Sequence, residues 1–104
     1  MQLFLESTFQ TVENPTDADV ARLLPQEREF AILSDGPDSL TYLQFAWSEE
    51  PGELLLEYQE GTLYTHFRAI GIDITITRVV AAFQKYARGD DSWKGDFRWE
   101  HVTV

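Results

Sequence analysis

Three closely spaced hydrophobic runs in the middle of the chain constrain its fold most. They cover residues 40–47, 54–58 and 63–70, and short segments containing Pro-Gly and Glu-Gly separate them. Each run is rich in aromatic and aliphatic residues, whereas proline and glycine favour turns. Short turns can join only antiparallel neighbours. The pattern therefore predicts a three-stranded antiparallel meander.

Alternation along the meander divides its side chains between two faces of the sheet. One set is apolar and is expected to pack against helices: Leu43, Phe45, Trp47, Leu54, Leu56, Tyr58, Leu63 and Phe67. The other set mixes aromatic and polar groups: Tyr42, Gln44, Glu53, Leu55, Glu57, Tyr64, His66 and Arg68. We expect this second face to meet solvent or a partner. Its candidate partner-binding residues are Tyr42, Gln44, Glu57, Tyr64, His66 and Arg68.

The segment before the meander predicts a strand, a short helix and a second strand. Residues 1–12 alternate imperfectly between apolar and polar side chains, as a strand does. Residues 16–24 predict the helix, with Thr16 as its N-cap and Pro25 ending it. The compact apolar run within residues 29–34 predicts the next strand.

The segment after the meander contains the strongest helical pattern in the chain. Residues 74–88 place apolar side chains at i, i+3, i+4 and i+7, which predicts an amphipathic helix. Either Asp73 or Thr75 can cap its start. Residues 90–96 are expected to form a loop, and residues 97–104 a final strand.

These elements follow the order β-α-β-β-β-β-α-β, within a length typical of one domain. Two helices over one face of a mainly antiparallel sheet make an α+β two-layer sandwich. We therefore expect residues 1–104 to form a single domain of this class.

The composition narrows the cellular setting. The chain has no cysteine, which excludes disulfides and zinc–thiolate sites and fits a cytoplasmic protein. Its N-terminus lacks the charged and apolar regions of a signal peptide, and no apolar run approaches the roughly 20 residues that span a bilayer. We expect a cytoplasmic protein with no membrane contact.

The charge is strongly negative and unevenly distributed. The net charge is −10. Residues 1–60 hold 13 acidic and two basic residues, a net −11, whereas residues 61–104 hold five acidic and six basic residues, a net +1. Such a field repels nucleic acid and favours a basic protein partner. The alternative is that the charge serves solubility alone.

No motif in the chain specifies a catalytic, metal or cofactor site. Glu53 and Glu57 share one strand face, and His66 could lie nearby, but the same pattern also describes solvated charges. Neither His66 nor His101 has a metal ligand at helical or strand spacing. The glycines form no phosphate-binding pattern. We therefore expect no enzyme activity, no metal and no cofactor.

An aromatic and acidic cluster follows the second predicted helix. It contains the candidate partner-binding residues Asp90, Asp91, Trp93 and Asp96. Tryptophan is enriched at protein interfaces, and neighbouring carboxylates suit a basic partner. Trp93 could instead fold back over the end of the helix, and both possibilities stay open here. Trp99, in the last strand, is expected to enter the core.

Four short motifs together resemble small α+β immunity proteins of bacterial polymorphic-toxin and contact-dependent systems. They are Tyr42-x-Gln44, the run 55–61 (Leu-Leu-Glu-Tyr-Gln-Glu-Gly), Ala82-Phe83-x-x-Tyr86, and Gly89-Asp90-x-x-Trp93 before a strand that contains Trp99. The resemblance implies a cytoplasmic, non-enzymatic protein that binds and blocks a cognate toxin, often a nuclease or deaminase with a basic cleft. The positions carried over are Glu57, Tyr58, Asp90, Trp93 and Trp99.

Two other functional classes remain open at this point. The polar and aromatic sheet face could be the wall of a small-molecule or enzymatic pocket. The same face could instead join two copies of the chain in a homodimer.

Overall fold

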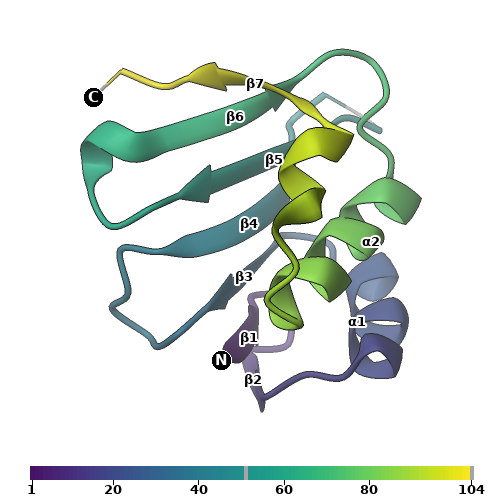
Figure 1. Ribbon diagram of the computed structural model, residues 1–104. Coiled ribbons are helices and arrows are strands. Elements are labelled where there is room, and N and C mark those ends of the chain that lie inside the picture. The colour runs from purple at the N-terminus through teal and green to yellow at the C-terminus, as the bar shows by residue number, and fades with distance from the viewer. Residues whose placement is uncertain (51, 104) are drawn as a thin grey trace.

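Seven strands form one antiparallel sheet in the computed structural model, which describes residues 1–50 and 52–103 (Figure 1). Every neighbouring pair of strands is antiparallel, and the order across the sheet is β2-β1-β3-β4-β5-β6-β7. The strands are β1 (Gln2–Leu5), β2 (Gln10–Glu13), β3 (Phe30–Ser34), β4 (Tyr42–Trp47), β5 (Leu54–Gln59), β6 (His66–Ile70) and β7 (Arg98–His101).

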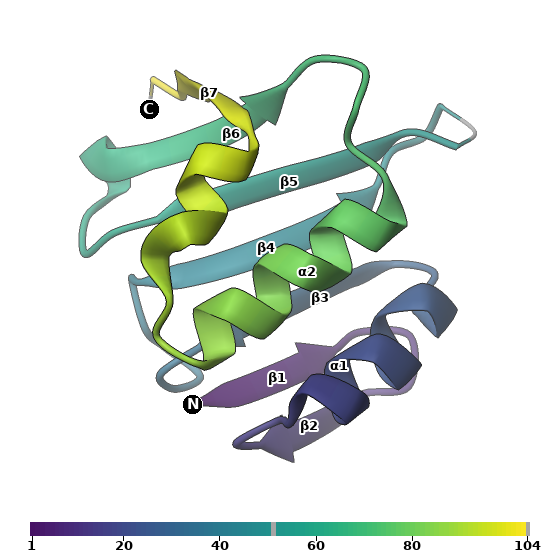
Figure 2. The same ribbon diagram turned by 45° about the vertical axis from the view of Figure 1, so that its right-hand side comes forward.

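The helices lie on one side of this sheet (Figure 2). They are the α-helices α1 (Asp17–Leu23) and α2 (Ile76–Ala87), and the 3₁₀ helix η3 (Asp91–Asp96) lies beside α2. Two further 3₁₀ turns are η1 (Leu24–Gln26) and η2 (Leu63–Thr65). The α+β two-layer architecture expected from the sequence is therefore confirmed.

Local capping explains where the two α-helices begin. The Thr16 hydroxyl accepts from the Asp19 amide, and the Asp19 carboxylate accepts from the Thr16 amide, which makes a capping box. The backbone hydrogen bond from Thr16 is the main reason that the pKa of Asp19 lies below its usual value. At α2 the cap is Thr75, whose hydroxyl accepts from the amide of Arg78.

The core lies between the helices and the strand positions that alternation assigned to the apolar face. Leu43, Phe45 and Leu56 are fully buried, and Phe83 of α2 meets Phe45 edge to face at a centroid distance of 5.8 Å. The other buried apolar side chains come from both layers: Leu3, Leu5, Val20, Leu24, Ala31, Leu33, Leu54, Tyr58, Ala69, Val79, Ala82 and Trp93. The division of the meander into two faces therefore holds over β4 and β5.

The N-terminal segment corrects the sequence prediction. Residues 1–12 do not form one strand, because β1 and β2 pair as a hairpin with Leu3 opposite Val12. A buried carboxylate explains the reversal: Glu27 accepts hydrogen bonds from the backbone amides of Ser7 and Glu29. These bonds tie the hairpin turn to the start of β3, and no sequence pattern near the turn reveals them.

The third run of the meander is also shorter than expected. Strand β6 begins at His66, because the Thr62 hydroxyl accepts from the Tyr64 amide and starts the 3₁₀ turn η2. Leu63 and Tyr64 are therefore exposed and lie on neither face of the sheet. This corrects their assignment by alternation, which applies only where the backbone stays extended.

The C-terminal elements differ from expectation in detail. The expected loop at residues 90–96 is mostly the 3₁₀ helix η3, which Asp90 caps by accepting from the amide of Ser92. The last strand, expected over residues 97–104, extends from Arg98 to His101. Residue 104 lies outside the described part of the chain.

Candidate functional site

The sheet face opposite the helices, here called the open face, is covered by no helix of the described residues (Figure 2). Strand register arranges its side chains in three rows that cross the sheet. The first row is Phe30, Ala46 and Leu55; the second is Phe4, Ile32, Gln44, Glu57, Arg68 and Glu100; the third is Ser34, Tyr42, Gln59 and His66. The open face therefore grades from apolar at one end of the strands to polar at the other.

The polar end is organised by Gln59, a residue that the sequence analysis did not select. Its side chain is 2% exposed, and its amide nitrogen donates to the carbonyl of Leu40 at 2.9 Å. Its amide oxygen therefore serves as the acceptor for the Tyr42 hydroxyl at 3.4 Å and for Nδ1 of His66 at 3.0 Å. This places a proton on Nδ1 of His66 and fixes the orientation of both rings.

Glu57 completes the polar network from the neighbouring row. Its carboxylate accepts from the side-chain amide of Gln44 at 3.2 Å and lies 3.6 Å from Nε2 of His66. Both ring nitrogens of His66 thus face acceptors on the protein itself. We define Tyr42, Gln44, Glu57, Gln59 and His66 as the polar strip, and its groups form a hydrogen-bonded surface.

The other two candidates on this face are placed differently. Arg68 lies next to Glu57 in the register but donates to the carboxylate of Glu100 on β7 at 3.0 Å. Tyr64 is 77% exposed on η2 and takes no part in the polar strip. The structure therefore brings together four of the six predicted residues, places Arg68 at their edge and separates Tyr64.

The apolar end of the open face carries an aromatic patch, which we define as Phe4, Phe9 and Phe30. The ring of Phe4 lies 5.7 Å from that of Phe9 and 6.2 Å from that of Phe30. Phe9 is 79% exposed. Its backbone also has a φ of 54°, a conformation that bulky residues rarely adopt. Strained residues of this kind concentrate at functional sites.

The alternation of side chains along β1 and β3 could have indicated part of this patch from the sequence. Leu3 and Leu5 are buried, so Phe4 between them points to the opposite face. Ala31 and Leu33 place Phe30 and Ile32 on that face in the same way. The exposure of Phe9 had no such signal, because it depends on the hairpin turn.

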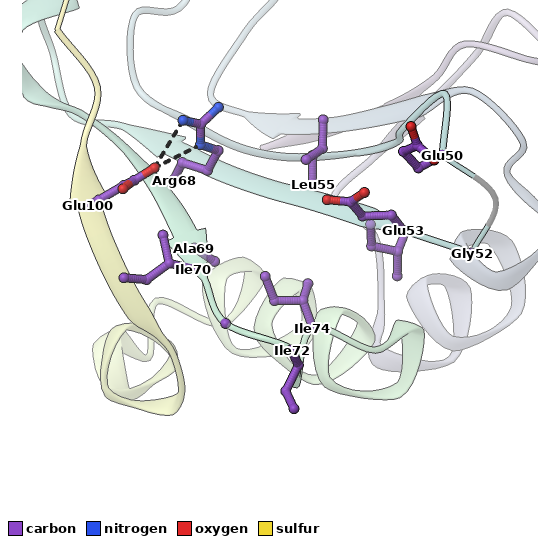
Figure 3. Close-up of a pocket in the computed structure, with 12 residues that line it drawn as sticks. Glu50, Gly52, Glu53, Leu55, Arg68, Ala69, Ile70, Ile72, Ile74 and Glu100 are labelled. Carbon is purple, nitrogen blue, oxygen red and sulfur yellow. Dashed lines mark hydrogen bonds and ion pairs between the residues drawn. The ribbon is translucent and has the colours of Figure 1, made fainter.

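A pocket of about 560 Å³ opens where β5 and β6 diverge (Figure 3). The pairing of β5 with β6 ends at Glu57 and Arg68. Beyond this point, Leu54–Leu56 of β5 pair with β4, whereas Ala69 and Ile70 of β6 pair with β7. The pocket has an apolar lining from Leu54, Leu55, Ala69, Ile70, Ile72 and Ile74, with Glu50, Glu53, Arg68 and Glu100 around it. It contains Arg68 but no residue of the polar strip.

The aromatic and acidic cluster divides into core and surface. Trp93 is buried, with its ring 5.0 Å from Tyr58 and 5.5 Å from Tyr86. Asp90 caps η3, and Asp96 pairs with Lys85 at 2.7 Å. Trp93 thus packs between the sheet and α2. The carboxylates of Asp90 and Asp96 both have partners within the protein, whereas Asp91 is exposed.

Trp99 packs into the same aromatic group, as expected. Its ring meets Tyr58 edge to face at 4.7 Å, and its indole N–H donates to the carbonyl of Lys94 at 2.8 Å. The two tryptophans of this segment therefore support the position of η3 against the sheet.

The phenol of Tyr86 lies at the edge of this aromatic group and has a strongly raised pKa. Burial is the main cause, and the negative charges of Asp35, Glu60 and Asp91 add to it, so that the pKa is raised from 10.0 to about 12. The folded protein thus holds this proton more tightly than the unfolded chain. The resulting contribution to the free energy of unfolding is fully present below about pH 10 and is lost as the pH rises through 12.

We expect NMR to find the Tyr86 ring still protonated at about pH 11, where an unperturbed phenol is mostly ionised. The assignment is checked with Tyr86→Phe, which should remove the late-titrating signal, and with Tyr64→Phe, which should keep it. A Tyr86 ring that is already mostly ionised at that pH would contradict the prediction.

Within the described residues, no group of three or more histidine or acidic side chains is arranged to hold a metal ion. No helix in that part of the chain is both long and apolar enough to cross a membrane. Comparison of the chain with protein-family models, curated protein sequences and solved structures found no match.

Proposed function

We propose that this chain is a non-enzymatic binding protein whose open face docks onto a basic protein and inhibits it, as an immunity protein blocks its toxin. The observation that carries the proposal is the aromatic patch on an uncovered sheet face of a strongly acidic protein. Exposed apolar groups beside polar ones are typical of protein interfaces. The resemblance of the sequence motifs to immunity proteins supports the same class.

The distribution of ion pairs favours a basic partner. Five of the eight lysine and arginine side chains are engaged by carboxylates of the protein itself: Arg22, Arg68, Lys85, Arg88 and Lys94. A sixth, Arg78, donates to the backbone carbonyls of Asp73 and Asp96. Among the described residues, only five of the 18 carboxylate side chains take part in such pairs. Most cations are therefore neutralised internally, while most acids still face outward.

The same charge argues against self-association through the open face. Two copies of a chain with a net charge of −10 repel each other, and this repulsion opposes burial of the patch between them. A cationic partner gains both burial of the apolar groups and electrostatic attraction. Sedimentation of the free protein tests this choice, and a stable dimer that Phe9→Asn dissociates would overturn it.

The functional test uses the product of the gene immediately upstream as the candidate partner. We expect that product to be toxic when expressed alone, and co-expression of this chain to protect the cell. The purified complex should associate more slowly as salt is raised, because electrostatic steering is screened. Absence of protection and of a complex would refute the proposal for that partner class.

Phe9→Asn separates binding from folding. Asparagine tolerates a positive φ, so the substitution should leave the fold intact while removing the most exposed ring of the patch. If Phe9 is an interface hot spot, binding should weaken by roughly 30-fold, corresponding to about 2 kcal/mol. Leu63→Asn is the matched control, since Leu63 is also exposed but lies off the open face. Equal loss of binding by both variants would exclude the aromatic patch as the contact.

A further inference from the structure

A second pocket, of about 360 Å³, is lined mainly by residues that pack on the helix side of the sheet. Three aromatic residues from three elements line it: Tyr58 of β5, Tyr86 of α2 and Trp93 of η3. Three carboxylates, those of Asp35, Glu60 and Asp91, also line it. The remaining lining comes from Met1, Thr41, Gln59 and Lys94.

An ammonium group of the protein already occupies this aromatic and acidic setting. Nζ of Lys94 lies 5.6 Å from the ring centroid of Tyr58 and 5.6 Å from that of Trp93. Both distances are within the range of a cation–π interaction. The same nitrogen forms an ion pair with Glu60. The lysine thus shows which chemistry the pocket accepts, namely an alkylammonium cation held by ring faces and a carboxylate.

The surrounding groups favour positive charge over negative. The hydrogen bond that the Lys94 ammonium donates to the carboxylate of Glu60 is the main cause of the raised pKa of Lys94. Burial is the main cause of the raised pKa of Tyr86, and the carboxylates of Asp35, Glu60 and Asp91, which line the pocket, raise it further. Met1 also lines the pocket, and its amino group donates to the side chain of Asn14 at 3.1 Å.

Lys94 holds its place only weakly. Its side chain is 39% exposed and that of Glu60 is 47% exposed, and ion pairs this open to water contribute little free energy. Lys94 also lies on a short 3₁₀ helix, from which its long side chain can rotate into solvent. A competing ammonium group could therefore take its position at low cost.

We propose that this pocket is a binding site for an alkylammonium group, and that Lys94 fills it in the free protein until a ligand displaces it. The ligand is a lysine side chain of the basic partner, and only this choice of source rests on the proposed function. The pocket would then add a second contact on the opposite side of the sheet from the aromatic patch.

The test titrates two probes into the protein while NMR follows the indole N–H signals of the tryptophans. The probes are Nα-acetyl-lysine methylamide and tetramethylammonium, at constant ionic strength. Trp93 lines the pocket, whereas the indole of Trp47 donates to the carbonyl of Glu27, and neither of these two residues lines the pocket, so Trp47 acts as an internal reference. We expect saturable shifts at Trp93 with no change at Trp47.

Removal of the internal lysine should open the site. In Lys94→Gln we expect the lysine probe to bind roughly two- to fivefold more tightly than in the wild type, because no cation competes and an exposed ion pair of this kind contributes at most about 1 kcal/mol. Lys85→Gln is the matched control: it removes one positive charge from another ion pair, that with Asp96, outside the pocket. Lys94→Met provides a second variant if the glutamine variant folds poorly.

The outcomes separate this inference from the proposed function. Equal affinity in the wild type and in both Lys94 variants, or the same gain in Lys85→Gln, would overturn the site, because attraction to the net charge would then explain binding. Saturation by tetramethylammonium alone would overturn the lysine as the source. Binding of the lysine probe in a protein that protects against no partner would uphold the pocket and refute the inhibitory function.

Discussion

Trp93→Ala is expected to lower the free energy of unfolding by about 3–5 kcal/mol, the range for removal of a large buried aromatic side chain. Trp93 is 2% exposed and lies against Tyr58, Tyr86 and Trp99 at centroid distances of 5.0, 5.5 and 5.8 Å. Its removal leaves a cavity between the sheet, α2 and η3 that these rings cannot fill without moving. Equilibrium unfolding in urea measures the loss.

The size of this effect matters because domains are stabilised by only about 5–15 kcal/mol. Trp93→Phe retains an aromatic ring and should cost clearly less than the alanine variant. Phe9→Asn, at an exposed position, should change stability little. An unfolding midpoint for Trp93→Ala equal to that of the wild type would show that this ring is outside the core and restore it as an interface candidate.

Phe83→Ala is the second substitution expected to cost about 3–5 kcal/mol. Phe83 is fully buried, and its ring meets Phe45 of β4 edge to face, so it joins α2 to the centre of the sheet. Truncation removes both the buried apolar surface and this ring contact. Urea unfolding should show a lower midpoint, and thermal unfolding a correspondingly lower Tm.

Thr77→Ala tests whether the loss at Phe83 reflects packing rather than the helix itself. Thr77 is exposed on the same helix, so its replacement should stay within about 0.5 kcal/mol of the wild type. A similar loss in both variants would contradict packing of Phe83 as the cause, because Thr77 is exposed and alanine favours the helix more than threonine does. A small loss at Phe83 alone would contradict the two-layer core.

Regular periodicity explains why much of the fold could be predicted. The α2 stripe and the alternation in β4 and β5 repeat over several residues, and each repeat places side chains on one face regardless of distant contacts. Leu43 and Phe45 are therefore buried, and Gln44 lies on the open face, as expected. The helix cap at Thr75 could also be foreseen as one of two candidates, because capping is local.

The candidate surface was only partly predictable for the opposite reason. Gln59 acquires its role by bonding to Leu40 and His66, and residue patterns do not indicate which partners will meet. Similarly, Glu27 holds the N-terminal hairpin turn by accepting from the amide of Ser7, which is 20 residues away in the sequence. Phe4 and Phe30 had the right alternation, but only pairing of β1 with β3 makes them neighbours of each other.

Trp93 shows most clearly where local pattern ends and tertiary structure begins. Its place among acids in a segment without periodicity suited an interface and a folded-back core residue equally well. The position of η3 against α2 and β5 decided between them, by enclosing the ring among aromatic residues far apart in the sequence. The apolar faces, the helix caps and the excess of negative charge were properties of the residues and their spacing. Burial of a single ring, the exposed aromatic patch and the occupied ammonium pocket arise from long-range contacts, because only folding brings their members together.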